Sequence, residues 1–195
     1  MKTDGTPKYH WNYFLAIEKD LENLSRYIEF SEANMKTYSI ELTHILLAAS
    51  SEIDVIMKQL CVLLDPEQKS DNINDYRSII QTHLSSFINE EISIDRFGLT
   101  FKPWKNWAGS ENPDWWKSSN HVKHQRNTHF EDANLKNAIN AVGALLLTVV
   151  YYYKFAFSKE SMGQLTFKDT THQLQPEASF LRINANYYNF HLVGG

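Results

Sequence analysis

The feature that most constrains this chain is residues 133–157, where the sequence predicts one long helix with apolar side chains around most of its circumference. The most hydrophobic part of it, residues 141–153, is bounded by Asn140 and Lys154. This part is shorter than the roughly 20 residues that a membrane-spanning helix needs. A helix that is apolar on nearly all sides must be covered by other elements, so we predict that it is the buried central helix of a bundle.

Glycine and proline are scarce, with 7 and 5 residues among 195, which is about half of their usual share. So few turn-forming residues argue against a β-sandwich, a barrel or a propeller. The length fits one domain of the common size, about 100 to 150 residues, with extensions. We therefore expect a mainly α protein with a single bundle of four to five helices.

Apolar residues at three-to-four spacing indicate further helices before the central one. The second helix should end before Pro66, because the residue preceding a proline disfavours helical backbone. Asp71 or Asn72 can cap the third helix, and Pro113 is well placed as the first residue of the fourth. The expected helices span residues 9–30, 38–64, 73–89, 114–126 and 133–157.

Two regions of the sequence predict extended structure. Residues 92–94 and 99–101 alternate between apolar and polar side chains on either side of a turn, which indicates a small β-hairpin. The alternation returns in residues 181–187 and predicts an extended segment that covers a helix face or pairs with the hairpin. We therefore expect a helical bundle over residues 9–158 and an extended C-terminal tail, residues 159–195, packed on it.

The composition excludes several classes of function. With 23 acidic and 19 basic residues the formal charge is −4, so no overall field attracts nucleic acid, and a site for a polyanion must be a local patch. The seven glycines form neither a phosphate-binding loop nor a dinucleotide fingerprint. Nucleotide hydrolysis of the usual kinds is therefore excluded, and no cofactor is expected.

The single cysteine, Cys61, lies in the apolar residues 60–64 and has no partner for an internal disulfide. It is predicted to be a buried, unreactive thiol, which fits a reducing compartment. The polar first residues do not have the pattern of a signal peptide. We therefore expect a cytoplasmic protein without a membrane partner.

Residues 115–129 form an unusual cationic and aromatic segment. They contain three of the eight histidines, two of the five tryptophans and three cations. His121 and His124 are one helical turn apart and could share a metal ion. However, the sequence has no His-Glu-x-x-His signature and offers no cysteine partner, so no metal site is expected.

Arg126 and His129 are three residues apart and share a face if the helix continues, with Lys123 one turn earlier. An arginine, a lysine and a neutral histidine on one surface can bind a phosphodiester, stabilise a pentavalent phosphorane and take the proton of a ribose 2′-hydroxyl. We predict that Arg126 holds the phosphate and that His129 or His124 acts as the acid or base. The predicted RNA-binding residues are Lys117, Lys123, Asn127 and Trp116.

A helical bundle with a long apolar last helix, and Arg126-Asn127 followed by a histidine just before that helix, resembles the HEPN superfamily (higher eukaryotes and prokaryotes nucleotide-binding domains). The resemblance covers residues 9–158 and implies an all-helical, often dimeric protein. It also implies metal-independent RNA cleavage in a toxin, abortive-infection or RNA-processing system. In that family four to six residues separate the arginine from the histidine, whereas His129 follows Arg126 after two, so the motif is divergent.

The resemblance further implies an RNA or nucleotide ligand, a homodimer, and an antitoxin or phage-defence protein as partner. Two functions from different classes remain open at this point. The first is a metal-independent endoribonuclease or its inactive descendant. The second is a non-catalytic helical protein-interaction module whose partner surface the sequence does not mark.

In the second function, the polar residues of the cationic segment would form a buried structural network with Glu52. Glu52 lies at the edge of the apolar face of its helix, where a carboxylate needs a partner or water. The residues expected in this network are Glu52, Asn120, Lys123, His124 and Arg126. Exposure of the arginine and of His129 to solvent would favour the enzyme, and burial against Glu52 would favour the network.

Overall fold

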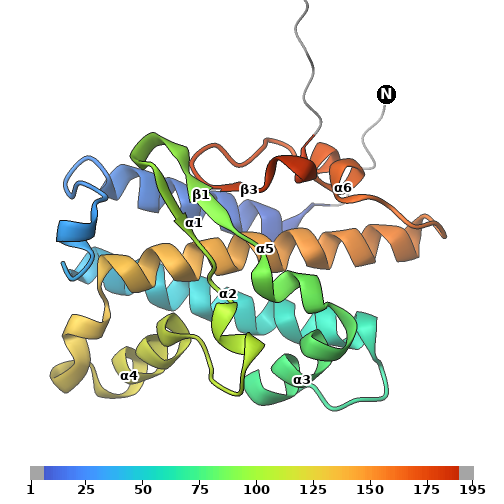
Figure 1. Ribbon diagram of the computed structural model, residues 1–195, viewed down its shortest axis with the longest axis horizontal. Helices are drawn as coiled ribbons and strands as arrows, with labels where there is room; N and C mark the ends of the chain where they lie inside the picture. The colour runs from blue at the N-terminus through green and yellow to red at the C-terminus, as the bar shows by residue number, and fades with distance from the viewer. Residues whose placement is uncertain (1–6, 189–195) are drawn as a thin grey trace, which may run out of the picture.

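The computed structural model describes residues 7–188 and shows a mainly helical protein with a small antiparallel sheet (Figure 1). Its α-helices are α1 (Tyr9–Leu24), α2 (Ile40–Leu64), α3 (Ile73–His83), α4 (Asp114–His129), α5 (Leu135–Glu160) and α6 (Phe167–Gln173). Its strands are β1 (Ile92–Ile94), β2 (Leu99–Phe101) and β3 (Arg182–Ile183). The predicted mainly α architecture with a small hairpin is confirmed.

The helix α5 is the centre of the protein. Of its 26 residues 16 are buried, and α1, α2, α4 and α6 all contact it. Figure 1 shows α5 crossing the middle of the molecule, with the hairpin lying over it. Its length and apolarity alone would also suit a membrane span, but 67% of its most apolar 18-residue window is buried inside the protein. The prediction of a buried central helix is confirmed.

The hairpin lies directly against α5. Antiparallel pairing of β1 and β2 sets Ile92 opposite Phe101 and Ile94 opposite Leu99. The Phe101 ring approaches α5 at Gly143 so closely that a Cβ atom there would lie 2.6 Å from it, a distance that forces one of the two to move. A glycine inside a helix lowers helix propensity, but here it lets the hairpin cover this side of α5.

Hydrogen bonds of two buried side chains, Glu18 and Trp11, hold the chain after α5 against α1. The carboxylate of Glu18, a residue only 3% exposed, accepts from the backbone N–H groups of Ser179, Phe180 and Leu181 at 3.2, 3.0 and 2.9 Å. The indole N–H of Trp11 donates to the carbonyl of Pro176 at 2.9 Å. The backbone of this segment therefore depends on α1 for its hydrogen-bond partners.

The sequence predicted an extended segment after α5, but the segment is not wholly extended. It contains the short helix α6. This helix begins with a reciprocal capping box between Thr166 and Asp169. With seven residues, α6 is too short to show a helical period. The strand β3 pairs with β1 and completes the sheet order β2-β1-β3, which is one of the two predicted placements. Residues 189–195, the end of the predicted tail, lie outside the described residues.

The first helix is shorter than predicted. It ends at Leu24 rather than near residue 30, and the turn that follows brings Phe30 to Phe97 and Phe180, with ring centroids 5.1 and 6.0 Å apart. Burial of an aromatic ring against the hairpin and the last segment thus outweighs continuation of the helix. The bounds of α2 and α5 agree with the prediction to within three residues.

The third helix is also shorter than predicted, and for a similar reason. It ends at His83 rather than near residue 89, because Leu84 has non-helical backbone angles (φ −138°, ψ 53°). The 3-10 turn that follows places Phe87 4.9 Å from Tyr151 and 5.4 Å from Trp104 between ring centroids. This turn brings an aromatic side chain to α5 that a straight helix would carry elsewhere.

Replacing Glu18 with alanine should leave three backbone N–H groups without their acceptor. We expect the free energy of unfolding, measured by urea denaturation, to fall by about 3 kcal/mol, because unsatisfied buried donors are costly. Asp20→Ala, at an exposed position of the same helix, is the control and should change it by less than about 0.5 kcal/mol. A Glu18→Ala protein as stable as the wild type would contradict this account.

Cys61 is fully buried, and burial, with a smaller effect of the Asp75 charge, raises the pKa of its thiol to about 12. The folded protein therefore disfavours the reactive thiolate. We expect a thiol reagent to modify Cys61 at about pH 8 only as fast as the protein unfolds. Because the folded pKa is raised, the contribution of this thiol to stability should be lost as the pH rises from about 9 toward about 12. Rapid modification of the folded protein would show that the thiol is accessible.

Candidate functional site

The helix α4 has one buried and one exposed face. Trp115, Ser118, Ser119 and Val122 recur at helical spacing and are buried, and α4 packs against α2 and α5. The indole N–H of Trp115 donates to the carbonyl of Pro103 at 2.9 Å, which fixes the first turn of the helix. The opposite face of α4 carries most of the predicted site residues into solvent.

The path of α4 changes at Gln125, whose backbone angles (φ −141°, ψ 43°) are not helical. In a straight helix, His121 and His129 would be separated by about 12 Å along the axis. With the kink, their ring centroids lie 4.7 Å apart and their planes differ by 35°. The predicted end of this helix, Arg126, falls next to the kink, and the chain continues as a second helical piece to His129.

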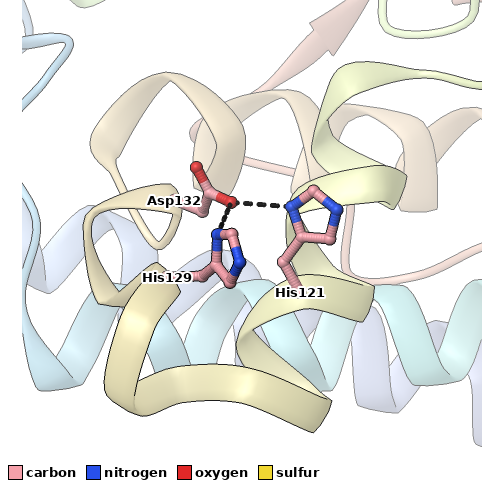
Figure 2. Close-up of side chains that lie close together, drawn as sticks. All are labelled: His121, His129 and Asp132. Carbon is pink, nitrogen blue, oxygen red and sulfur yellow. Dashed lines mark hydrogen bonds and ion pairs between the residues drawn. The ribbon is translucent and has the colours of Figure 1, made fainter.

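The two imidazoles meet at the carboxylate of Asp132, which lies in the turn between α4 and α5 (Figure 2). Nδ1 of His121 lies 2.9 Å, and Nδ1 of His129 3.6 Å, from the same oxygen, Oδ2. The side chains of His121, His129 and Asp132 are 52%, 38% and 30% exposed. We call these three residues the His-Asp cluster, and it faces solvent.

Both rings of the His-Asp cluster use Nδ1 toward the carboxylate, and within residues 7–188 the Nε2 atoms of the two rings make no hydrogen bond. A carboxylate that accepts from Nδ1–H fixes the tautomer of a histidine and leaves Nε2 able to exchange a proton with a substrate. The same three side chains also form a group whose donor atoms lie within 4.8 Å of one another, as in a metal site. The arrangement suits either acid-base chemistry or a cation.

A buried amide holds the parts of the His-Asp cluster together. Nδ2 of Asn137 on α5 donates to Oγ of Ser118 on α4 and to the backbone carbonyl of Asp132, both at 2.9 Å. The side chain of Asn134 caps α5 by accepting from the Asn137 N–H at 3.0 Å. The turn that carries Asp132 is therefore tied to both helices, which positions its carboxylate for the two rings.

The cations of the predicted RNA site lie on the surface around the His-Asp cluster. Lys123, His124, Arg126 and Asn127 are exposed, and no ion pair within the described part of the chain includes any of the first three. The charges of Lys123 and Arg126 are thus uncompensated. The geometry does not bring His124 to the cluster.

Two of the predicted RNA-binding residues are engaged elsewhere. Nζ of Lys117 lies 2.7 Å from the Glu111 carboxylate, and this hydrogen bond raises the pKa of the lysine. Trp116 is half-buried and meets Trp115 edge to face at 5.8 Å. Their positions on α4 are compatible with the rim of a binding surface, but neither side chain is free in the way that Arg126 is.

The predicted network around Glu52 is wrong. Oε1 of Glu52 lies 2.6 Å from Nδ1 of His10 on α1, and these side chains are only 16% and 17% exposed. The other ring nitrogen of His10 lies 3.3 Å from the Gln59 amide. Asn120 is exposed, as are the cations that the network was expected to bury. A carboxylate at this position does need a partner, but the first helix supplies it.

The sequence interpretation missed Asp132 and considered His121 only together with His124. A helical wheel cannot join His121 to His129, because the contact depends on the kink at Gln125. One signal was present: Asp132 follows His129 by three residues, a spacing at which side chains on a helical turn meet.

A surface pocket of about 300 Å³ lies beside the supports of the His-Asp cluster, between β2 and the first turns of α4 and α5. Asn137 lines it, as do three lysines, Lys102, Lys105 and Lys136. The carboxylates of Glu32 and Asp114 are also present. Within residues 7–188 none of the three lysines forms an ion pair, so the pocket presents free cations beside the first turn of α4.

Comparison with known proteins gives no significant match to a family model, to a curated protein or to a solved structure. The resemblance to the HEPN superfamily therefore stays a hypothesis that depends on helix order and on Arg126, Asn127 and His129.

Replacing Asn137 with alanine should loosen the turn that carries Asp132. Two hydrogen bonds are lost and the buried Ser118 hydroxyl loses its donor, so the free energy of unfolding should fall by about 2 kcal/mol. Asn140→Ala is the matched control, because among the described residues the Asn140 amide donates only to the Lys136 carbonyl of its own helix. Urea denaturation measures both variants. Equal losses of stability in the two would contradict a special role for Asn137.

Proposed function

We propose that this protein binds single-stranded RNA along the exposed face of α4 and cleaves it without a metal ion, as a divergent HEPN-like endoribonuclease. The observation that carries the proposal is the pairing of two solvent-facing imidazoles, His121 and His129, on one carboxylate. Arg126, exposed and uncompensated, lies three residues before His129. Two histidines and an arginine are the groups that metal-free RNA cleavage needs.

The chemistry assigns one proton transfer to each histidine. Neutral His129 accepts the 2′-hydroxyl proton at Nε2, and the resulting oxygen attacks the adjacent phosphorus. The bond from phosphorus to the 5′-oxygen breaks, and protonated His121 gives a proton from Nε2 to that leaving oxygen. Arg126 offsets the charge that develops on the phosphorane. The products are a 2′,3′-cyclic phosphate and a 5′-hydroxyl, and proton transfer through water restores the two histidines.

Asp132 is a positioning residue in this mechanism. When Nδ1 of each ring carries a proton, Oδ2 of Asp132 can accept it and leave Nε2 directed to the substrate. Nδ1 of His121 lies within hydrogen-bond distance of Oδ2, at 2.9 Å, whereas Nδ1 of His129, at 3.6 Å, has to move closer to form one. The shorter contact fixes the orientation of the His121 ring, and we assign the role of the acid to that ring.

The charges near the site support binding of a polyanion in a protein whose net charge is −4. Lys123 and His124 are exposed just before the kink of α4 at Gln125, and Arg126 and Asn127 are exposed just after it. Lys102, Lys105 and Lys136 surround the neighbouring pocket. A local cationic surface of this kind binds phosphates with an affinity that decreases as salt increases.

The biological setting comes only from the HEPN resemblance. It includes a homodimer, an antitoxin or defence protein as partner, a toxin or phage-defence role and a cytoplasmic location. Each of these stays a prediction. The arrangement of helices around α5, with a short hairpin, is compatible with the expected bundle over residues 9–158.

The test is incubation of the purified protein with single-stranded RNA in the presence of a chelator, with the product ends identified by mass spectrometry. Wild-type protein should leave 2′,3′-cyclic phosphates. His129→Ala should lower the rate by about a hundred- to ten-thousand-fold, the usual contribution of a positioned acid or base, while RNA binding stays nearly unchanged. Arg126→Ala should weaken both cleavage and binding.

His172→Ala is the control for loss of a histidine, because His172 is exposed on α6, away from α4. It should cleave RNA at the wild-type rate. If wild-type protein neither cleaves RNA nor binds it in a salt-sensitive way at micromolar concentration, the proposal fails. The non-catalytic protein-interaction module is then the better description.

A further inference from the structure

We propose that His121, His129 and Asp132 form a binding site for one transition-metal ion of the zinc class. The sequence contains no metal-binding motif for this site, because the ligands come from both sides of a kink and from the turn that follows. The site is carried by the geometry of the His-Asp cluster and not by a motif.

The distances fit a metal coordination sphere. In a tetrahedral site with bonds of about 2.1 Å, neighbouring ligand atoms lie about 3.4 Å apart. The two Nδ1 atoms lie 2.9 and 3.6 Å from Oδ2 of Asp132, on either side of that value. All three donor atoms lie within 4.8 Å of one another, so small side-chain rotations suffice to complete the site.

The chemistry of the donors selects the kind of metal. Two imidazole nitrogens and one carboxylate oxygen suit Zn²⁺, Cu²⁺, Ni²⁺ or Co²⁺. Mg²⁺ and Ca²⁺ prefer sites made of oxygen atoms, and here a single carboxylate supplies them. Because the three side chains are 52%, 38% and 30% exposed, a fourth position remains open to water, as in zinc sites with three protein ligands.

Buried hydrogen bonds hold the ligands of the His-Asp cluster in place, as they do in natural metal sites. The side-chain amide of Asn137 donates to the backbone carbonyl of Asp132, and it also donates to the Ser118 hydroxyl on α4. Outer groups that fix the ligands contribute strongly to metal affinity. The kink at Gln125 keeps His129 beside His121, so a metal ion does not need to draw two distant segments together.

Metal binding would also regulate the proposed RNA cleavage, and this part of the inference rests on the proposed function. A metal ion held through Nδ1 of His121 and His129 leaves a proton on each Nε2. Neither ring can then accept a 2′-hydroxyl proton, so the metal-bound protein should not cleave RNA. Removal of the metal by a chelator would restore cleavage.

The direct test is calorimetric titration of the chelator-treated, tag-free full chain with Zn²⁺. Wild-type protein should bind about one Zn²⁺ per chain at this site. His129→Ala, His121→Ala and Asp132→Ala should each weaken binding about tenfold or more. Titration with Co²⁺ should give the visible absorption of a tetrahedral ion in the wild type and lose it in the same variants. Mg²⁺ should not compete.

His124→Ala is the matched control for metal affinity, because His124 lies on the same helix, one turn from His121, and outside the cluster. It should bind Zn²⁺ as tightly as the wild type. Circular dichroism should confirm that every variant remains folded. Equal Zn²⁺ affinity of wild type and His129→Ala, or a loss in His124→Ala as large as in His129→Ala, would overturn the proposal.

The two proposals fail in different ways. If Zn²⁺ binds with the expected dependence on the three residues but metal-free protein does not cleave RNA, the metal site stands and the ribonuclease does not. If metal-free protein cleaves RNA and Zn²⁺ neither binds nor inhibits, the ribonuclease stands and the metal site does not. Inhibition by Zn²⁺ that His172→Ala, the control for cleavage on α6, retains supports both.

Discussion

The need to cover α5 on every side determines most of this structure. A helix with 16 buried residues among 26 cannot be hidden by one neighbour, because each helix in contact covers only one stripe of its surface. The helices α1, α2 and α4 cover part of it, and the hairpin and α6 cover more. The hairpin reaches the helix only because Gly143 has no side chain where Phe101 lies. The apolar burial gained repays the helix propensity lost at the glycine.

The same requirement explains why polar groups lie deep in the protein. The last segment can cover α5 only if its own backbone is satisfied, and Glu18 supplies an acceptor for three of its N–H groups. Nearby, Glu90 accepts from Tyr151 on α5 and Tyr187 at 3.2 and 2.6 Å, and burial raises the pKa of Tyr151 to about 12. Glu18 is buried and Glu90 is half-buried, and each carboxylate is held by several donors, which is how such charges are tolerated.

The sequence is sufficient to predict the elements whose signal is local. The apolar circumference of α5 and the alternation on both sides of the hairpin turn gave their positions correctly. It was insufficient where burial redirects the chain, as at Phe30 and Phe87, since a helical period continues across those turns. Glu52 shows the same limit: its need for a partner follows from its position on α2, but nothing in the sequence distinguishes His10 from the cations of α4 as that partner.

The candidate site follows the same division between local and long-range information. Arg126 and His129 were chosen for their chemistry and spacing, and both lie on the exposed surface. The pairing of His129 with His121 required a backbone break at Gln125, a residue with no special helix-breaking character. What holds the break in place is the Asn137 amide, whose two hydrogen bonds join α4 to the turn before α5.

Asp132 takes part in both of the chemistries proposed for this site, and the two exclude each other. When its oxygen accepts protons from the two Nδ1 atoms, the Nε2 atoms are available to a phosphodiester substrate. When a metal ion takes the place of those protons, the carboxylate becomes a ligand and both Nε2 atoms keep a proton. Competition between protons and a metal ion at Nδ1 would therefore decide whether Nε2 carries a proton. The Nε2 atoms are on the side of the rings away from the carboxylate. A single carboxylate with one oxygen near both rings (Figure 2) would couple the two proposed chemistries.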